Sequence, residues 1–267
     1  MGGRRTAVAV FVLLAVAGAA CGGGQPSEAP AAPGRALVVG DSVMFDAAPA
    51  IAAALESGGV AVVQWPVLGF GLTRPAAYYD WRTEWRSLVD DHRPDLVVAM
   101  VGGWDFPDLV ERGRRFPTGT DGWAERYGQL LDVATEILTS QGAQLYWVTS
   151  PPYRTVEPPG ALGAVNAAVV ASAERHPSAR VVDGYGALAG ADGAYTDLLP
   201  DDRGHLERVR KDDGVHLCSP GAARVGAVVA EAVAGDHGLM VDPGWRDGPW
   251  RDDPRYVEGI EGGRCLG

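Results

Sequence analysis

The sequence predicts a three-layer α/β/α sandwich, in which a five-stranded parallel sheet lies between two layers of helices. Short apolar runs alternate along the chain with longer amphipathic or alanine-rich segments, which is the pattern of repeated β-α-β units. The short runs carry few polar residues, as expected for parallel strands covered on both faces. Right-handed crossovers then favour the flavodoxin-like strand order 2-1-3-4-5.

In the first half of the domain, strands and helices follow one another closely. Residues 36–39 (Ala-Leu-Val-Val) form a buried strand that ends at Gly40. Residues 47–57, rich in alanine, form a helix that ends where Gly58 follows. The elements expected next are a strand over 60–64, a helix over 81–91 and a strand over 96–101.

The second half repeats this alternation around one longer helix. That helix begins at Asp121 or Gly122 and reaches Ser140, with apolar side chains at three- and four-residue spacing. Residues 184–214 are expected to form a polar loop. The elements that complete the domain are a strand over 144–148, a helix over 161–174, a strand over 180–182 and a last helix over 220–234.

The N-terminal segment, residues 1–20, resembles a secretory signal peptide. Its apolar run over 7–20 is shorter than the roughly 20 residues that span a bilayer. The run leads into Cys21, as in bacterial lipoproteins whose cysteine is lipidated, although Gly18 stands where a larger aliphatic residue is usual. An ordinary signal peptide is the alternative. Either way we expect export, with the protein lipid-anchored to the outer face of the cytoplasmic membrane or secreted.

Three further parts of the chain follow from composition. Residues 21–34 are a flexible linker, residues 35–237 the folded domain, and residues 238–267 an irregular C-terminal tail rich in Gly, Asp, Arg and Pro. The formal net charge is −11, which disfavours nucleic acid and anionic lipid as partners. Membrane contact is therefore expected only through the lipid anchor, and the domain is expected to be a monomer.

The cysteines predict a disulfide. If Cys21 carries lipid, Cys218 and Cys265 remain as an even pair in an oxidising compartment. A bridge between them would pin the tail to the segment that carries His216, and closing so long a loop stabilises by ~4 kcal/mol in the chain-entropy model. The histidines are scattered without ligand-like spacing, so neither a metal nor another cofactor is expected.

Two motifs carry the chemistry. Gly40-Asp41-Ser42 follows the first strand directly, at the sheet edge where sites form in such folds. Near the other end of the domain stands Asp213-Gly214-Val215-His216, just before the last helix. A carboxylate three residues before a histidine can accept from its Nδ1–H, which leaves Nε2 free to take a proton from a serine.

Together these motifs resemble the first and last sequence blocks of the SGNH (GDSL) hydrolase superfamily, over residues 35–235. The resemblance implies that Ser42 is the nucleophile, His216 its base and Asp213 the residue that orients the base, whereas Asp212 has the wrong position. It also implies an oxyanion hole that includes the backbone N–H of Ser42 and of a glycine after the second strand. Spacing favours Gly69, with Gly71 as the alternative.

The third block departs from the family pattern. The family has Gly-x-Asn-Asp after the third strand, and here Gly102-Gly103-Trp104-Asp105 stands in that place. The family asparagine donates to the oxyanion, and losing one such donor can cost ~10²–10³ in rate. The indole N–H of Trp104 can replace that donor, or the ring can form an apolar wall.

The resemblance implies a serine esterase or deacylase that works through an acyl-enzyme on an ester, with an O-acylated glycan as one candidate substrate. An O-acyltransferase with the same triad is the first alternative. A non-catalytic, SGNH-like lipoprotein that binds glycan or protein is the second, and the missing asparagine is its support. Tyr153 and Arg154, after the fourth strand, are candidate substrate contacts.

Overall fold

The computed structural model describes residues 2, 32–74, 77–260 and 262–265. The chain divides into residues 1–30 and a compact unit, residues 31–267, and the fold below is that of the second unit. The signal peptide, the lipidation of Cys21 and most of the linker lie outside the described residues and stay predictions. Within the described residues, no helix is long and apolar enough to cross a membrane.

One parallel sheet forms the centre of the compact unit. Its strands in spatial order are β2 (Ala61–Pro66), β1 (Arg35–Gly40), β3 (Leu96–Met100), β6 (Gln144–Val148) and β7 (Ala179–Val182). All four neighbouring pairs are parallel, so the carboxyl ends of the strands meet at one edge. The predicted order 2-1-3-4-5 of the sheet strands is confirmed.

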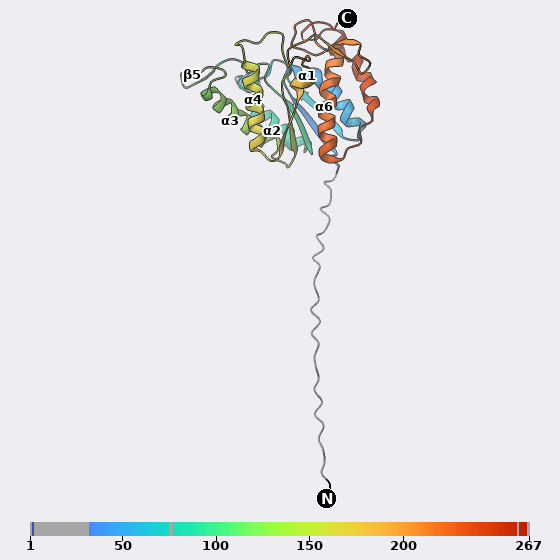
Figure 1. The fold of residues 1–267 in the computed structure, drawn as a ribbon. Helices are drawn as coiled ribbons and strands as arrows, with labels where there is room; N and C mark the ends of the chain where they lie inside the picture. The colour runs from blue at the N-terminus through green and yellow to red at the C-terminus, as the bar shows by residue number, and fades with distance from the viewer. Residues whose placement is uncertain (1, 3–31, 75–76, 261, 266–267) are drawn as a thin grey trace. The chain divides into compact units, whose positions relative to one another are not determined.

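Helices cover both faces of this sheet, which confirms the three-layer sandwich (Figure 1). On one face, α1 (Ser42–Ser57) packs beside α6 (Ser219–His237) over the side chains of Ala36 and Val38. On the other face, Leu37 and Val39 meet the remaining long helices. Those helices are α2 (Trp81–His92), α3 (Asp121–Leu138) and α4 (Ala161–Arg175).

Helix α1 begins five residues earlier than its alanine-rich pattern predicts. Asp41 is its N-cap, and its side chain accepts from the backbone N–H groups of Val43 and Met44. The helix therefore starts at Ser42, directly after β1. Small residues hold α1 close to α6: a Cβ on Gly226 would lie 3.0 Å from the Ala50 backbone.

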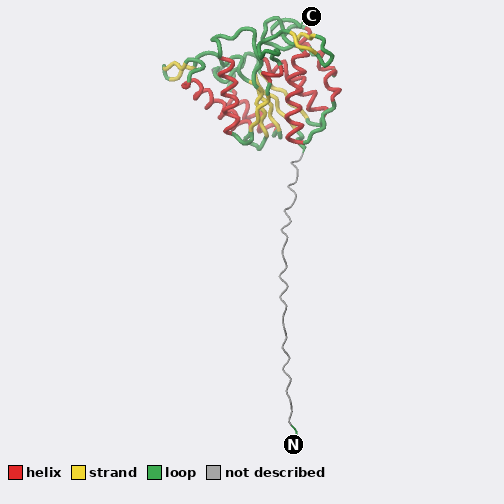
Figure 2. The backbone as a smooth tube through the Cα atoms, in the orientation of Figure 1, coloured by secondary structure: helices red, strands yellow, loops and turns green. Residues whose placement is uncertain are grey.

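Several short elements complete the unit (Figure 2). A hairpin of β4 (Leu109–Glu111) and β5 (Arg114–Phe116) precedes α3. The segment expected as a polar loop contains α5 (Gly184–Ala187) and a hairpin of β8 (Leu198–Pro200) and β9 (Leu206–Arg208). These elements are too short to leave a periodic pattern in the sequence.

The C-terminal segment contains helical turns where the sequence suggested irregular chain. They are η1 (Pro243–Asp247), η2 (Pro249–Asp252) and α7 (Pro254–Val257). Trp245 and Tyr256 are buried against alanines of α1 and α6, so two aromatic side chains fasten this segment to the helix pair. Its high content of Gly, Pro and charged residues conceals these two anchors.

Candidate active site

The turn between β1 and α1 presents Ser42 at the carboxyl edge of the sheet. Gly40 has a φ of +150°, and a Cβ there would lie 2.1 Å from the carbonyl oxygen of Met100, so only glycine fits. Ser42 is the first residue of the helix and is 5% exposed. Because Asp41 already binds the next two N–H groups, the Ser42 N–H is the first-turn donor left for a ligand.

The second motif folds into a carboxylate–imidazole pair. Asp213 Oδ2 lies 2.5 Å from His216 Nδ1. Asp213 Oδ1 accepts from the backbone N–H groups of Val215 (2.9 Å) and His216 (3.0 Å). The carboxylate is therefore held in place by its own turn, and it fixes the tautomer with the proton on Nδ1.

The charges of the pair support each other. Burial alone lowers the pKa of His216, but the Asp213 hydrogen bond and the negative charges of Asp46 and Asp213 outweigh burial and raise that pKa above 6.5. Burial raises the pKa of Asp213, and its three hydrogen bonds and the charge of His216 more than offset this, so that pKa is lowered. Asp213 thus stays ionised and stabilises the imidazolium that would form during catalysis.

Helix α1 and the histidine loop are joined by a buried ion pair. Asp46, one turn along α1 from Ser42, accepts from Lys211 Nζ at 2.9 Å. Both side chains are fully buried. The other oxygen of Asp46 accepts from the backbone N–H of Leu217 at 2.8 Å. Helix α1 and the segment that carries His216 are therefore fixed to each other directly.

The second ring nitrogen of His216 is the predicted proton acceptor. His216 Nε2 is buried and has no hydrogen-bond partner among the described residues, Ser42 Oγ included. Catalytic hydrogen bonds are often long in ligand-free sites and tighten with substrate. The Ser42–His216 contact stays a prediction.

Two loops at the same edge are cross-linked by buried aspartates. Asp41 accepts from the Gly103 N–H at 3.0 Å. Asp105 accepts from Leu72 N (3.2 Å), Thr73 N (2.9 Å), Thr73 Oγ1 (2.8 Å) and Tyr127 Oη (3.0 Å). Burial raises the pKa of Asp41 to about 6 despite three backbone N–H donors. These aspartates hold the predicted oxyanion loops against the Ser42 turn.

The oxyanion glycines differ in their surroundings. Gly69 has a φ of +69°, and a Cβ there would lie 2.8 Å from Tyr78 Oη. A Cβ on Gly71 would lie 2.7 Å from Asp105 Oδ1. The backbone conformation thus requires glycine at position 69, and close packing requires it at position 71, so the geometry leaves open which N–H lines the hole.

Trp104 lies at the rim of this region and is 45% exposed. The guanidinium carbon of Arg74 lies 4.7 Å from the centroid of its ring system and 4.8 Å from the ring centroid of Tyr78. Tyr78 in turn donates to the Leu68 carbonyl at 2.6 Å. The indole therefore belongs to a stacked cluster, Tyr78–Arg74–Trp104, next to the predicted oxyanion glycines.

The two candidate substrate contacts have different environments. Tyr153 is buried, and its hydroxyl has no partner within the described ranges. It lines a cavity of about 430 Å³ together with Tyr185 and Tyr195. Arg154 instead pairs with Asp197 at 2.9 Å and donates to the Asp212 carbonyl at 2.7 Å. Tyr153 thus lines a cavity that none of the predicted triad residues lines, whereas Arg154 braces the loop before His216.

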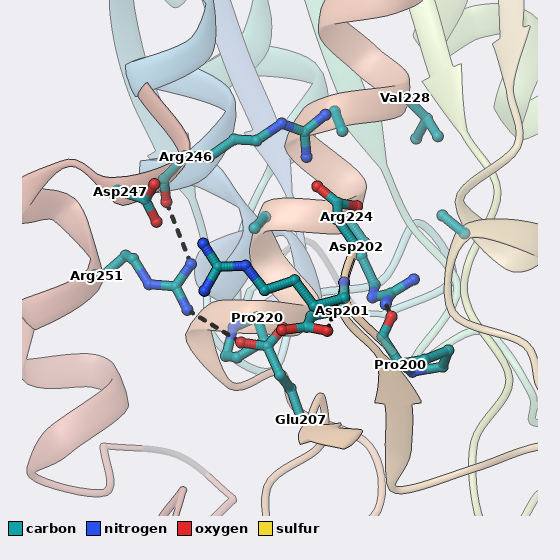
Figure 3. A pocket seen from close by; sticks show the side chains of 14 residues that line it. Pro200, Asp201, Asp202, Glu207, Pro220, Arg224, Val228, Arg246, Asp247 and Arg251 are labelled. Carbon is teal, nitrogen blue, oxygen red and sulfur yellow. Dashed lines mark hydrogen bonds and ion pairs between the residues drawn. The ribbon is translucent and has the colours of Figure 1, made fainter. Parts of the chain in front are cut away.

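A separate cavity of about 550 Å³ lies over the N-terminal half of α6 (Figure 3). Arg251 approaches Glu207 at 3.8 Å and Arg224 donates to the Pro200 carbonyl there. Its four arginines face four carboxylates, so it carries no net charge of its own. None of the triad residues lines it, and it is therefore not the site of the predicted chemistry.

The predicted disulfide is present. Cys218 and Cys265 are bonded, with their Cα atoms 5.5 Å apart. Among the residues the structure describes, no cluster of three or more His, Cys, Asp or Glu side chains could hold a metal ion.

Sequence reasoning missed Asp46 and Lys211. The only signal for Asp46 was its spacing, since a carboxylate four residues after Ser42 lies on the same helix face as the serine. Lys211, the single lysine of the chain, gave no signal that it would be buried against α1.

Comparisons with known proteins agree with this architecture. A family model described as a protein of unknown function (DUF459) matches residues 35–232. No curated protein matches the chain.

Solved structures share the fold at low identity. A GDSL-like lipase from Bacteroides thetaiotaomicron is 14% identical, with a TM-score of 0.54, and the match covers 75% of this chain and 88% of that one. A carbohydrate esterase of family 3 from Talaromyces cellulolyticus is 17% identical, with a TM-score of 0.52 and coverage of 76% and 97%. The fold implied by the SGNH resemblance is confirmed.

Proposed function

We propose that this chain, which belongs to the DUF459 family and has the fold of SGNH hydrolases, is a serine esterase that works through an acyl-enzyme. The observation that carries the proposal is the Asp213–His216 pair. The Nε2 atom of His216 is buried and has no hydrogen-bond partner in the part of the chain that the structure describes. Asp46 ties the pair to the helix that begins with Ser42. Neutral imidazole with an anchored carboxylate behind it is the arrangement that activates a serine hydroxyl.

In the proposed reaction, Ser42 Oγ attacks the ester carbonyl while His216 Nε2 takes its proton. Asp213 stabilises the resulting imidazolium. The N–H groups of Ser42 and Gly69 donate to the oxyanion of the tetrahedral intermediate. His216 then gives the proton to the leaving alcohol, and the acyl group remains on Ser42. Water, deprotonated by His216, releases the acid and restores the serine.

We further propose an O-acylated carbohydrate as the substrate and an exported, monomeric enzyme held by lipid on Cys21 or secreted. The exposed rings of Tyr78 and Trp104 beside the oxyanion loops support a sugar, because aromatic faces that remain exposed at a site offer contact area at low entropic cost. The acidic chain disfavours a polyanionic substrate.

An acyltransferase is the second candidate, because the same acyl-enzyme can be opened by a sugar hydroxyl instead of water. A non-catalytic binding protein is the third, and the tryptophan in place of the family asparagine is what favours it. The three candidate functions differ in whether the protein forms an acyl-enzyme and in which acceptor releases the acyl group. Only the first two form an acyl-enzyme, and only the second depends on an added alcohol.

The test is steady-state hydrolysis of p-nitrophenyl acetate by the parent protein and Ser42→Ala. An esterase predicts turnover that Ser42→Ala abolishes, at a rate that added sugar acceptors do not increase. A rate that rises with an acceptor, together with acylated acceptor detected by mass spectrometry, would favour the transferase. If the parent protein and Ser42→Ala both hydrolyse the ester only at the background rate, the non-catalytic binding protein would be the remaining candidate.

A further inference from the structure

The last described residues of the chain return to the loop that carries the base. Lys211 Nζ donates to the Ile260 carbonyl at 2.9 Å, in addition to its bond with Asp46. The backbone N–H of Asp213 donates to the Gly262 carbonyl at 3.1 Å. Cys265 is bonded to Cys218, two residues after His216. Three different interactions thus join Ile260, Gly262 and Cys265 to the catalytic loop.

Gly262 lies directly over the Asp213–His216 hydrogen bond. A Cβ on Gly262 would lie 2.5 Å from Asp213 Oδ2 and 2.6 Å from His216 Nδ1, which are the two atoms of that bond. Its φ is +75°, a backbone conformation that also favours glycine. The backbone of this residue therefore packs against the pair as closely as a residue without a side chain can.

The neighbouring Gly263 is a natural comparison. It has a φ of +95°, but a Cβ there would lie 3.3 Å from the Cβ of Asp212, whose side chain is not part of the triad. Both glycines lie in the C-terminal tail and both have a positive φ. Only Gly262 packs against the Asp213–His216 pair.

Contact with backbone at this point has a chemical consequence. The Asp213 side chain remains 32% exposed, so the effect of Gly262 is one of packing: its backbone restricts rotation of the carboxylate away from the ring. A carboxylate held in this place keeps His216 in the tautomer that leaves Nε2 free. The tail thus supplies a wall of the proposed active site from outside residues 35–232, the part of the chain that the DUF459 family model matches.

We propose that Gly262 is a positioning residue for the Asp213–His216 pair, and that the Cys218–Cys265 disulfide holds it there, so that full esterase activity requires the oxidised disulfide. This rests on the proposed function, because Asp213 and His216 are its orienting residue and base. The Asp213–His216 pair is then fully positioned only after the disulfide has tethered Gly262, which requires an oxidising compartment.

The test compares Gly262→Ala with Gly263→Ala, using p-nitrophenyl acetate hydrolysis and thermal unfolding. Misplacement of catalytic groups by about 1 Å can cost ~10²-fold, so kcat of Gly262→Ala should fall by about 10- to 100-fold with KM little changed. Gly263→Ala should keep the parent kcat while its melting temperature falls similarly. Equal kcat in all three proteins, or equal losses in both variants, would overturn the role of Gly262.

A second experiment leaves Gly262 unchanged, so it tests the proposal even if Gly262→Ala does not fold. A phosphine reductant and one water convert the disulfide into two thiols, and the phosphine takes the water oxygen to become the phosphine oxide. The parent should lose kcat on reduction and regain it on reoxidation, whereas Cys265→Ser should have the lower kcat from the start and not respond. Full kcat with two titratable thiols would overturn the role of the disulfide. Parent turnover that Ser42→Ala abolishes supports the esterase in either case, so the two proposals fail separately.

Discussion

Asp46 accepts a hydrogen bond from the backbone N–H of Leu217, at 2.8 Å, across the interface between helix α1 and the histidine loop. Asp46 follows Ser42 by one helical turn, and Leu217 follows His216 by one residue. The two halves of the proposed catalytic machinery come from opposite ends of the domain. This bond and the Asp46–Lys211 ion pair hold them in register.

Replacing Asp46 tests whether that register matters. Burial raises the pKa of Asp46 to about 6 even beside Lys211, and Asp46→Asn removes the carboxylate that forms the buried ion pair with this lysine. Breaking such a pair costs about 3–5 kcal/mol, and urea unfolding of Asp46→Asn at pH 8 should show a loss of this size. Asp90→Asn, at an exposed carboxylate bonded to Gln141, is the control and should be nearly neutral. A loss in Asp46→Asn no larger than in the control would mean that the ion pair does not hold the register.

Substitutions at Trp104 test what the tryptophan does in place of the family asparagine. Its ring is half exposed and stacks on Arg74, so we expect it to form a wall and not to donate to the oxyanion. Trp104→Phe should then leave kcat for p-nitrophenyl acetate nearly unchanged, whereas Trp104→Ala should mainly raise KM for larger esters. A fall of ~10²–10³ in kcat for Trp104→Phe, with rescue by Trp104→Asn, would instead identify the indole N–H as an oxyanion donor.

The pH dependence of hydrolysis reports on the base. His216 acts when neutral, and its pKa is raised above 6.5, so kcat/KM should be lost as pH falls through a value above 6.5. Among the described residues, the charged groups that act on His216 are Asp213 from its own turn, Asp46 from α1 and Lys211 from the same loop.

Asp213→Asn removes the largest contribution that raises this pKa. The acidic limb of the profile should move to lower pH, and kcat should fall by about 10⁴, as for the equivalent change in a serine protease triad. Asp212→Asn is the matched control and should keep the parent profile. A shift in Asp212→Asn and none in Asp213→Asn would reverse the assignment of the orienting residue.

The sheet and its order could be predicted because the strands are short apolar runs separated by clear helical patterns. The start of α1 could not, because the alanine-rich run begins only at Ala47, whereas the Asp41 cap starts the helix at Ser42. The hairpin of β8 and β9 has three residues in each strand, which is too few for alternation to be visible.

For the candidate site, the sequence could predict the Asp213–His216 pair but not the residues that hold it in place. Asp213 and His216 are three residues apart, so local geometry alone brings them together. Asp46, Lys211 and Gly262 act through contacts between distant segments. Nothing in the local pattern distinguishes Gly262 from the other glycines of the tail.

The most direct test of the account is covalent labelling of the parent protein with a fluorophosphonate, followed by peptide mapping. The reagent reacts with serines whose hydroxyl is activated by a neighbouring base, and it needs no knowledge of the natural substrate. We predict one labelled peptide, with the adduct on Ser42, and loss of labelling in His216→Ala. An unlabelled parent protein, or labelling that persists in His216→Ala, would contradict the assignment of Ser42 and His216 as nucleophile and base.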